Sequence, residues 1–325
     1  MKSNLTVKII VLTFCTLLLD VRIGHCQKDT IKLGVFITSL YDFDLNQNSF
    51  KCDFWLWSVY KNQKMDFAKQ VEVTNTKNIG FDFTKVDKLN GFYWYSSKVK
   101  AEIRKQWDVK AFPFDKQNLE ITIESSENDS SMVVFTCDSK NSKLNPTLYS
   151  TLKEWKVTKS HFFINKVVYN TNFGNPNISD RNVFPTFNVH IELERKNSFW
   201  VLFKLITGLL VAFLAAWCVF FIRPSNVEPR FGIIVGGLFA AIANKYIVEG
   251  IVPLTNELTL LDNIHNATFI YILLILILSI ISVHIYEKRT VRSRKKSKLI
   301  DNISKVSILV FYILTLFYIF SHYLN

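Results

Sequence analysis

The residues that could perform catalysis do not form a recognisable catalytic set. Five of the six histidines are scattered through different stretches of the sequence after the first 26 residues, at His161, His190, His265, His284 and His322. The sequence contains no HExxH zinc motif, no GxSxG nucleophile motif and no phosphate-binding P-loop. We therefore expect a protein that is not an enzyme and that binds neither a metal nor a cofactor.

A different kind of chemistry is indicated by the stretch FPFD, which comprises Phe112, Pro113, Phe114 and Asp115. The proline fixes its own φ angle, so two aromatic rings project from a rigid turn. The aspartate adds a negative charge at the entrance to a predicted strand, where Arg195 from another strand could pair with it. Taken alone, the turn has a simpler interpretation, in which it only seals the base of a domain.

The distribution of apolar residues divides the chain. They cluster in residues 198–325, whereas residues 27–197 have the composition of a soluble domain. Residues 1–26 combine a charged start with a short apolar run, which predicts a signal peptide rather than a first membrane span. The net charge is +12, but the densest basic run, residues 287–298, lies between apolar segments. This position favours a topology signal, so we expect no nucleic-acid partner.

Four segments are long and apolar enough to cross the hydrocarbon core as helices: residues 199–222, 231–253, 267–286 and 303–323. The loops between them are basic, acidic and basic in turn. Because Lys and Arg collect in cytoplasmic loops, the loop 287–298 is expected in the cytoplasm and the C-terminus outside. The sequence predicts a multi-pass protein of a plasma membrane, the bacterial inner membrane, with an extracellular or periplasmic N-terminal domain.

Residues 27–197 are predicted to form strands. Several stretches are rich in β-branched and aromatic residues, and clusters of turn-forming residues separate them. The last stretch alternates, with Phe187, Val189, Ile191 and Leu193 on one face. Many short strands with regular turns predict an all-β sandwich.

Two cysteines, Cys52 and Cys137, fall in the predicted exported domain. In an oxidising compartment they could form a disulfide. They could equally remain two unpaired strand residues, since the sequence does not give the distance between their Cα atoms.

The order of these parts resembles the pentameric ligand-gated ion channels, in particular their prokaryotic members. The stretch DVKAFPFDKQNL (108–119) is similar to the signature loop of the family, F/Y-P-F-D-x-Q. IELERKNSF (191–199) resembles the strand that enters the first helix, and residues 228–253 resemble the pore helix. Lys105 and Leu119 stand where animal members have two cysteines, as in prokaryotic relatives.

The resemblance implies a homopentamer in which an extracellular β-sandwich precedes a four-helix transmembrane bundle. It also implies that the signature loop transmits motion of the sandwich to the pore. The residues expected to do so are Asp44, Phe112, Pro113, Phe114, Asp115 and Arg195. In this hypothesis Asp44 competes with Asp115 for the arginine.

The second predicted helix carries a stripe of mostly small residues at helical spacing: Glu228, Gly232, Gly236, Phe239, Ala243, Tyr246 and Gly250. In a pentamer this stripe could line a pore with an acidic ring, a wide glycine zone and a hydrophobic girdle at Phe239. Gly232 and Gly236 also form a GxxxG motif, which packs helices together. On spacing alone both interpretations stay open.

Charged residues near this helix bear on ion selectivity. Glu228 favours cations, whereas Pro229 and Arg230 resemble the pore mouth of anion-selective members. Lys245 and Glu249 are four residues apart, so they can form a pair on one helix face or contribute a selectivity ring. We expect conduction of inorganic cations.

The resemblance places the agonist, a small molecule or a proton, between neighbouring sandwiches under residues 170–184. Seven residues are expected to bind it: Trp55, Trp57, Glu127, Asp129, Tyr169, Phe173 and Phe184. An aromatic box of this kind suits amines through cation–π contacts. The alternative is that these aromatic residues fill the core of the sandwich. The W-x-P motif of the family is missing from this chain.

Together these patterns predict a ligand-gated ion channel whose partners are identical subunits, an agonist, inorganic ions and membrane lipid. The alternative is a non-conducting membrane sensor or assembly protein on the same fold, because a fold does not establish an activity.

Overall fold

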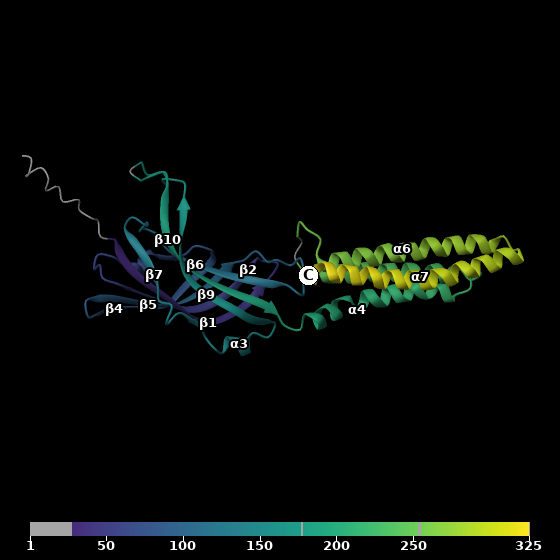
Figure 1. Ribbon diagram of the computed structural model, residues 1–325, viewed down its shortest axis with the longest axis horizontal. Coiled ribbons are helices and arrows are strands. Elements are labelled where there is room, and N and C mark those ends of the chain that lie inside the picture. The colour runs from purple at the N-terminus through teal and green to yellow at the C-terminus, as the bar shows by residue number, and fades with distance from the viewer. Residues whose placement is uncertain (1–27, 177, 253–254, 325) are drawn as a thin grey trace, which may run out of the picture.

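The chain is elongated, with strands at one end and long helices at the other (Figure 1). This computed structural model describes residues 28–176, 178–252 and 255–324, so the predicted signal peptide, residues 1–26, lies outside the described residues. The strands are β1 (Asp29–Asp44), β2 (Ser49–Tyr60), β3 (Val71–Val73), β4 (Thr76–Leu89), β5 (Phe92–Arg104), β6 (Lys116–Ser125), β7 (Val133–Cys137), β8 (Lys143–Leu144), β9 (Trp155–Tyr169) and β10 (Asn182–Arg195). The helices are α2 (Phe67–Gln70), α3 (Leu148–Thr151), α4 (Ser198–Trp217), the 3-10 helix η1 (Cys218–Phe221), α5 (Val227–Glu249), α6 (Leu260–Glu287) and α7 (Val291–Leu324).

Two sheets form the strand-rich end, which confirms the predicted β-sandwich. One sheet has the order β4-β5-β2-β1-β7, with β8 also paired to β1, and the other has the order β3-β6-β10-β9. Strand alternation explains the core. On β10 the predicted apolar face is buried, and on β2 every second residue from Cys52 to Tyr60 is buried. Each strand therefore presents one apolar face to the other sheet.

No strand was predicted at residues 76–89, where β4 forms a hairpin with β5. The two strands pair from Thr76↔Ile103 to Leu89↔Phe92 and are joined by Asn90 and Gly91. Both turn residues have positive φ, 48° and 85°. An Asn-Gly pair with positive φ at both positions is the preferred two-residue hairpin turn, so this dipeptide was the signal for the missing strand.

The cysteines do not form a disulfide. Cys52 and Cys137 are both free thiols. They lie on β2 and β7, and β1 separates these two strands in the sheet. The disulfide interpretation is therefore wrong, and Cys52 instead fills space in the core, where burial raises the pKa of its thiol.

Four helical segments are long and apolar enough to span a membrane: Ser198–Phe221, Val227–Glu249, Leu260–Glu287 and Val291–Leu324. This confirms a multi-pass membrane region. The second segment begins at Val227, so it includes Glu228, and it ends before Gly250. α6 begins seven residues earlier than the predicted 267, because Thr259 and Asp262 form a capping box that starts the helix at Leu260.

The basic run expected as a loop over residues 287–298 is mostly helical, so that prediction is wrong. α6 continues to Glu287 and α7 starts at Val291, which leaves a connection of residues 288–290. Lys and Arg are good helix formers. Small residues also let the two helices approach closely, since Ser297 Oγ donates to Ser282 O at 2.8 Å. At 1.5 Å per residue α7 is roughly 50 Å long, well beyond the ~30 Å hydrocarbon core.

A polar contact inside the bundle joins three helices. Asn244 of α5 donates from Nδ2 to Leu205 O of α4 at 3.1 Å, and its Oδ1 lies 3.0 Å from His265 Nε2 of α6. The other nitrogen of His265, Nδ1, lies 2.8 Å from Leu261 O. A neutral imidazole has one N–H, so His265 can donate to only one of these two oxygens at a time. The contact nevertheless brings polar groups of α4, α5 and α6 together, which can fix the lateral register of α5.

Candidate functional site

The junction between the sandwich and the bundle contains a buried ion pair. Arg195, the last residue of β10, donates from Nε to Asp115 Oδ1 at 2.9 Å and from Nη2 to Asp115 Oδ2 at 3.4 Å. The side chains are 7% and 2% exposed. Gln117 Nε2 also donates to Asp115 Oδ2, at 2.8 Å. The sequence predicted this pairing, and strand β6, which follows the FPFD turn, positions the aspartate.

Two aromatic rings enclose the guanidinium of Arg195. Its Cζ atom lies 4.1 Å from the ring centroid of Trp155 and 4.8 Å from that of Phe112. Phe112 is therefore packed against the ion pair. Phe114 instead lines two cavities next to Tyr323 at the end of α7. Desolvated cation–π contacts of this kind strengthen the hold on the arginine.

Asp44 does not compete for Arg195, so that expectation is wrong. Its Oδ1 accepts a hydrogen bond from Gln47 N at 2.8 Å, within the turn that connects β1 to β2. The second carboxylate near Arg195 is Glu154, whose Oε2 lies 3.8 Å from Nη1 with a side chain that is 76% exposed. Sequence reasoning missed both Glu154 and Trp155, which precede and begin β9, because nothing in their spacing relates them to Arg195.

A second connection ties the signature loop to α6. Leu260 N donates to Lys110 O at 2.8 Å, and Lys110 Nζ lies 2.9 Å from Glu257 Oε2. The first helical amide of α6 therefore finds its acceptor on the sandwich. Together with the covalent passage from β10 into α4, these contacts hold the loop at residues 108–117 against two transmembrane helices.

The predicted pore stripe on α5 has few contacts within the chain. All seven of its residues are exposed, with Phe239 at 67% and Tyr246 at 71%. The buried face of the helix comprises Arg230, Ile234, Gly237, Ala241 and Val248. A Cβ atom added to Gly232 or Gly236 would meet nothing within 4 Å in the described chain, whereas at Gly237 it would meet Ala212 O at 2.8 Å. The glycine that packs helices within one chain is therefore Gly237, not the GxxxG pair.

The charged residues of α5 separate into two groups. Arg230 is fully buried and donates from Nη2 to Asp301 Oδ1 of α7 at 3.0 Å, on the face opposite Glu228. Arg230 therefore does not lie on the exposed stripe. A resemblance to the pore mouth of anion-selective members would place it there. Lys245 Nζ lies 3.7 Å from Glu249 Oε1 and 3.9 Å from Asp262 Oδ1, which favours a structural pair.

A cavity of about 660 Å³ lies at the far end of the sandwich, beneath the β9–β10 hairpin. Five of the seven predicted ligand-binding residues line it: Glu127, Asp129, Tyr169, Phe173 and Phe184. The ring centroid of Tyr169 lies 5.9 Å from that of Phe173 and 5.7 Å from that of Phe184. These side chains are partly or largely exposed, so they do not fill the sandwich core.

The cavity also contains two carboxylates that the sequence analysis missed. Glu72 of β3 and Glu124 of β6 are directly opposite each other in the antiparallel pair, and both line the cavity. Burial, followed by the charge of Glu72, raises the pKa of Glu124 to about 7, and the hydrogen bond from Tyr169 Oη to Glu124 Oε2 opposes this rise. No sequence signal marked them, because β3 has three residues and no recognisable pattern.

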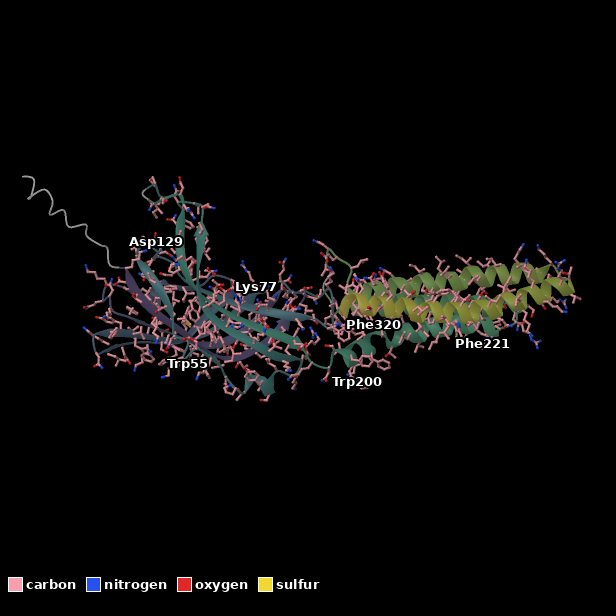
Figure 2. The ribbon with its side chains drawn as sticks, viewed as in Figure 1. Trp55, Lys77, Asp129, Trp200, Phe221 and Phe320 are labelled. Carbon is pink, nitrogen blue, oxygen red and sulfur yellow. The ribbon has the colours of Figure 1, made fainter. Side chains whose placement is uncertain are left out.

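The two predicted tryptophans lie elsewhere. Trp55 and Trp57 belong to β2 in the other sheet and point away from the core, and Figure 2 shows Trp55 and Asp129 on opposite sides of the sandwich. Trp57 lies flat over Gly34, where an added Cβ would come within 2.5 Å of the indole ring, and its Nε1 donates to Asp138 Oδ2 at 3.2 Å. Within one chain these tryptophans do not reach the cavity.

No protein-family model matches the chain, and no curated protein matches its sequence. The class of the protein therefore rests on its architecture. It combines an N-terminal β-sandwich with four apolar helices of membrane-spanning length. This architecture is compatible with a channel.

Proposed function

We propose that this protein is a ligand-gated ion channel of the pentameric family, in which α5 lines a central pore and an agonist binds at the sandwich. The observation that carries the proposal is the stripe on α5. Its residues have the small-residue spacing of a pore helix and remain exposed while the opposite face is packed. In a ring of identical subunits such a face would meet water at the central axis.

Two further observations support the same function. The buried pair of Asp115 and Arg195, with the bond from Leu260 N to Lys110 O, connects the sandwich to the start of α4 and α6. The cavity under the β9–β10 hairpin combines three aromatic rings with carboxylates, which suits a cationic amine. We propose that Trp55 and Trp57 of the neighbouring subunit complete this site.

Cation conduction is the expected selectivity. Glu228 is exposed on the stripe at the end of α5 remote from the sandwich, whereas Arg230 is buried and paired with Asp301. Rings of carboxylates favour cations. We expect the positive charge of Arg230 to be hidden from a passing ion, since Asp301 neutralises it.

The first test is the subunit count by native mass spectrometry of the purified protein in detergent. Five subunits are expected. The second is sodium flux into liposomes for Phe239→Ser, which should leak without any agonist because a polar ring no longer excludes water from the girdle. The matched control is Phe317→Ser on α7, a phenylalanine with 72% exposure outside the stripe.

A monomer or dimer that persists in lipid would remove the central pore. Pentamers in which Phe239→Ser and Phe317→Ser both stay silent would favour the non-conducting sensor, since the junction and the cavity would serve that function equally well.

A further inference from the structure

The bundle carries a basic pocket at the end remote from the sandwich. Its volume is about 450 Å³. It is lined by residues of η1 and of the connection to α5, by Tyr286 of α6, and by one face of α7. Figure 2 shows Phe221, which belongs to this pocket, towards that end of the bundle.

Four cations line the pocket: Arg223, Arg294, Lys298 and Lys305. The three on α7 are spaced by four and seven residues, which places them on one side of the helix. Among the described residues none of the four has a carboxylate within salt-bridge distance, and the charged ends of Arg294 and Lys305 lie 5.7 and 4.8 Å from the rings of Tyr286 and Phe221.

The single carboxylate of the pocket is already neutralised. Asp301 accepts a hydrogen bond from Nη2 of the fully buried Arg230 at 3.0 Å, and its own side chain is 6% exposed. Among the described residues the four surrounding cations are therefore not paired with an acid. Such a pocket attracts an anion with several acceptor oxygens, and a phosphate group fits this description.

The walls of the pocket distinguish between a phosphate in solution and one carried by a lipid. Phe220, Phe221 and Ile222 supply apolar walls, and Phe221 is 62% exposed at the outer surface of the bundle. α7 exceeds the hydrocarbon thickness by roughly 20 Å, so its basic start extends into the headgroup layer. An amphiphile can place its phosphate among the cations and its chains against the aromatic wall.

We propose that this pocket binds the phosphate of an anionic membrane lipid. The bound lipid would bridge η1, the start of α5 and the basic turns of α7. It would thereby hold these helix ends together at the end of the bundle remote from the sandwich. The inference does not depend on the channel function, because a sensor with the same bundle would have the same pocket.

The test titrates the full-length protein in detergent with three probes and counts bound molecules by native mass spectrometry. The probes are dioleoyl phosphatidylglycerol, dioleoyl phosphatidylcholine and glycerol 1-phosphate. The pocket variant is Arg294→Gln/Lys298→Gln. The matched control is Lys295→Gln/Lys296→Gln, which removes the same charge from the same turns of α7 at exposed positions outside the pocket.

Phosphatidylglycerol should bind the unaltered protein and the control at least about tenfold more tightly than phosphatidylcholine. The pocket variant should lose affinity by roughly 30-fold, since each of the two basic residues contributes a factor of about five near a lipid headgroup. Equal binding of the two lipids to the unaltered protein would overturn the proposal, and so would equal losses in the two double variants. Glycerol 1-phosphate binding as tightly as the lipid would assign the pocket to a soluble phosphate instead.

Discussion

Replacing Asp115 by Asn should destabilise the sandwich strongly, because it leaves Arg195 without its buried counter-charge. The Arg195 side chain is 7% exposed, and its guanidinium is held between Trp155 and Phe112. Removal of one partner from a buried ion pair costs about 3–5 kcal/mol. A domain of this size shifts its Tm by about 2–4 °C for each kcal/mol, so we expect a decrease of about 6–20 °C.

The matched control is Glu154→Gln, which removes the other carboxylate near the same arginine. Glu154 lies 3.8 Å from Nη1, but its side chain is 76% exposed. Exposed ion pairs contribute at most about 1 kcal/mol. Tm is measured by tryptophan fluorescence, for which Trp155 and its stacked neighbour Trp107 provide local reporters. In 1 M salt the Debye length falls to about 3 Å, so the Glu154 contribution should vanish while the Asp115 contribution remains.

Comparable losses in Asp115→Asn and Glu154→Gln would refute this reasoning, and so would a loss in Asp115→Asn that high salt removes. The charge exchange Asp115→Arg with Arg195→Asp tests function as well. If the pair couples the sandwich to the pore, each single reversal should impair gating in assembled pentamers, and the double reversal should recover part of it.

Three other predictions follow from the cavity and the helices. Because the pKa of Glu124 is raised to about 7, the folded protein retains a proton that the unfolded chain loses, so the unfolding free energy should fall between about pH 4.5 and 7 and then level off. Glu124→Gln should remove this part of the slope in Tm against pH, and an unchanged slope would contradict the assignment. Choline should bind more tightly as pH rises from 6 to 8, since the ionised carboxylate attracts it, and isothermal titration of Glu124→Gln should show no such gain. Gly237→Ala should cost about 1–3 kcal/mol, because its Cβ would lie 2.8 Å from Ala212 O, whereas Gly236→Ala has open space and should not lower the thermal stability of the bundle in detergent.

The parts of the fold that depend on periodicity could be predicted. The alternation of Phe187, Val189, Ile191 and Leu193 placed β10 correctly, and hydropathy located four helices. The ends of the helices were harder to predict, because they depend on local hydrogen bonds. The capping box at Thr259 extended α6 towards the sandwich, and close packing through Ser282 and Ser297 made a helix of residues expected to form a loop.

The part of the candidate site that contains the FPFD motif could be predicted. The pairing of Asp115 with Arg195 is present, whereas Asp44 caps its own turn instead of approaching the arginine. The acidic pair Glu72 and Glu124 was missed, because cross-strand neighbours become visible only when the register is known. The same limit hid the pairing of Arg230 with Asp301, which lie on different helices.

The register of β6 and β10 determines whether these two strands can slide past one another. These strands pair without interruption from Thr186↔Glu124 to Glu194↔Lys116, a span of roughly 26 Å. The cavity residue Glu124 lies at one end and Asp115 and Arg195 lie at the other. Sliding one strand by a residue would turn the buried Val189 outward, so the pair cannot absorb a push by shear. A displacement at the cavity end would therefore move β6 and β10 together rather than past one another.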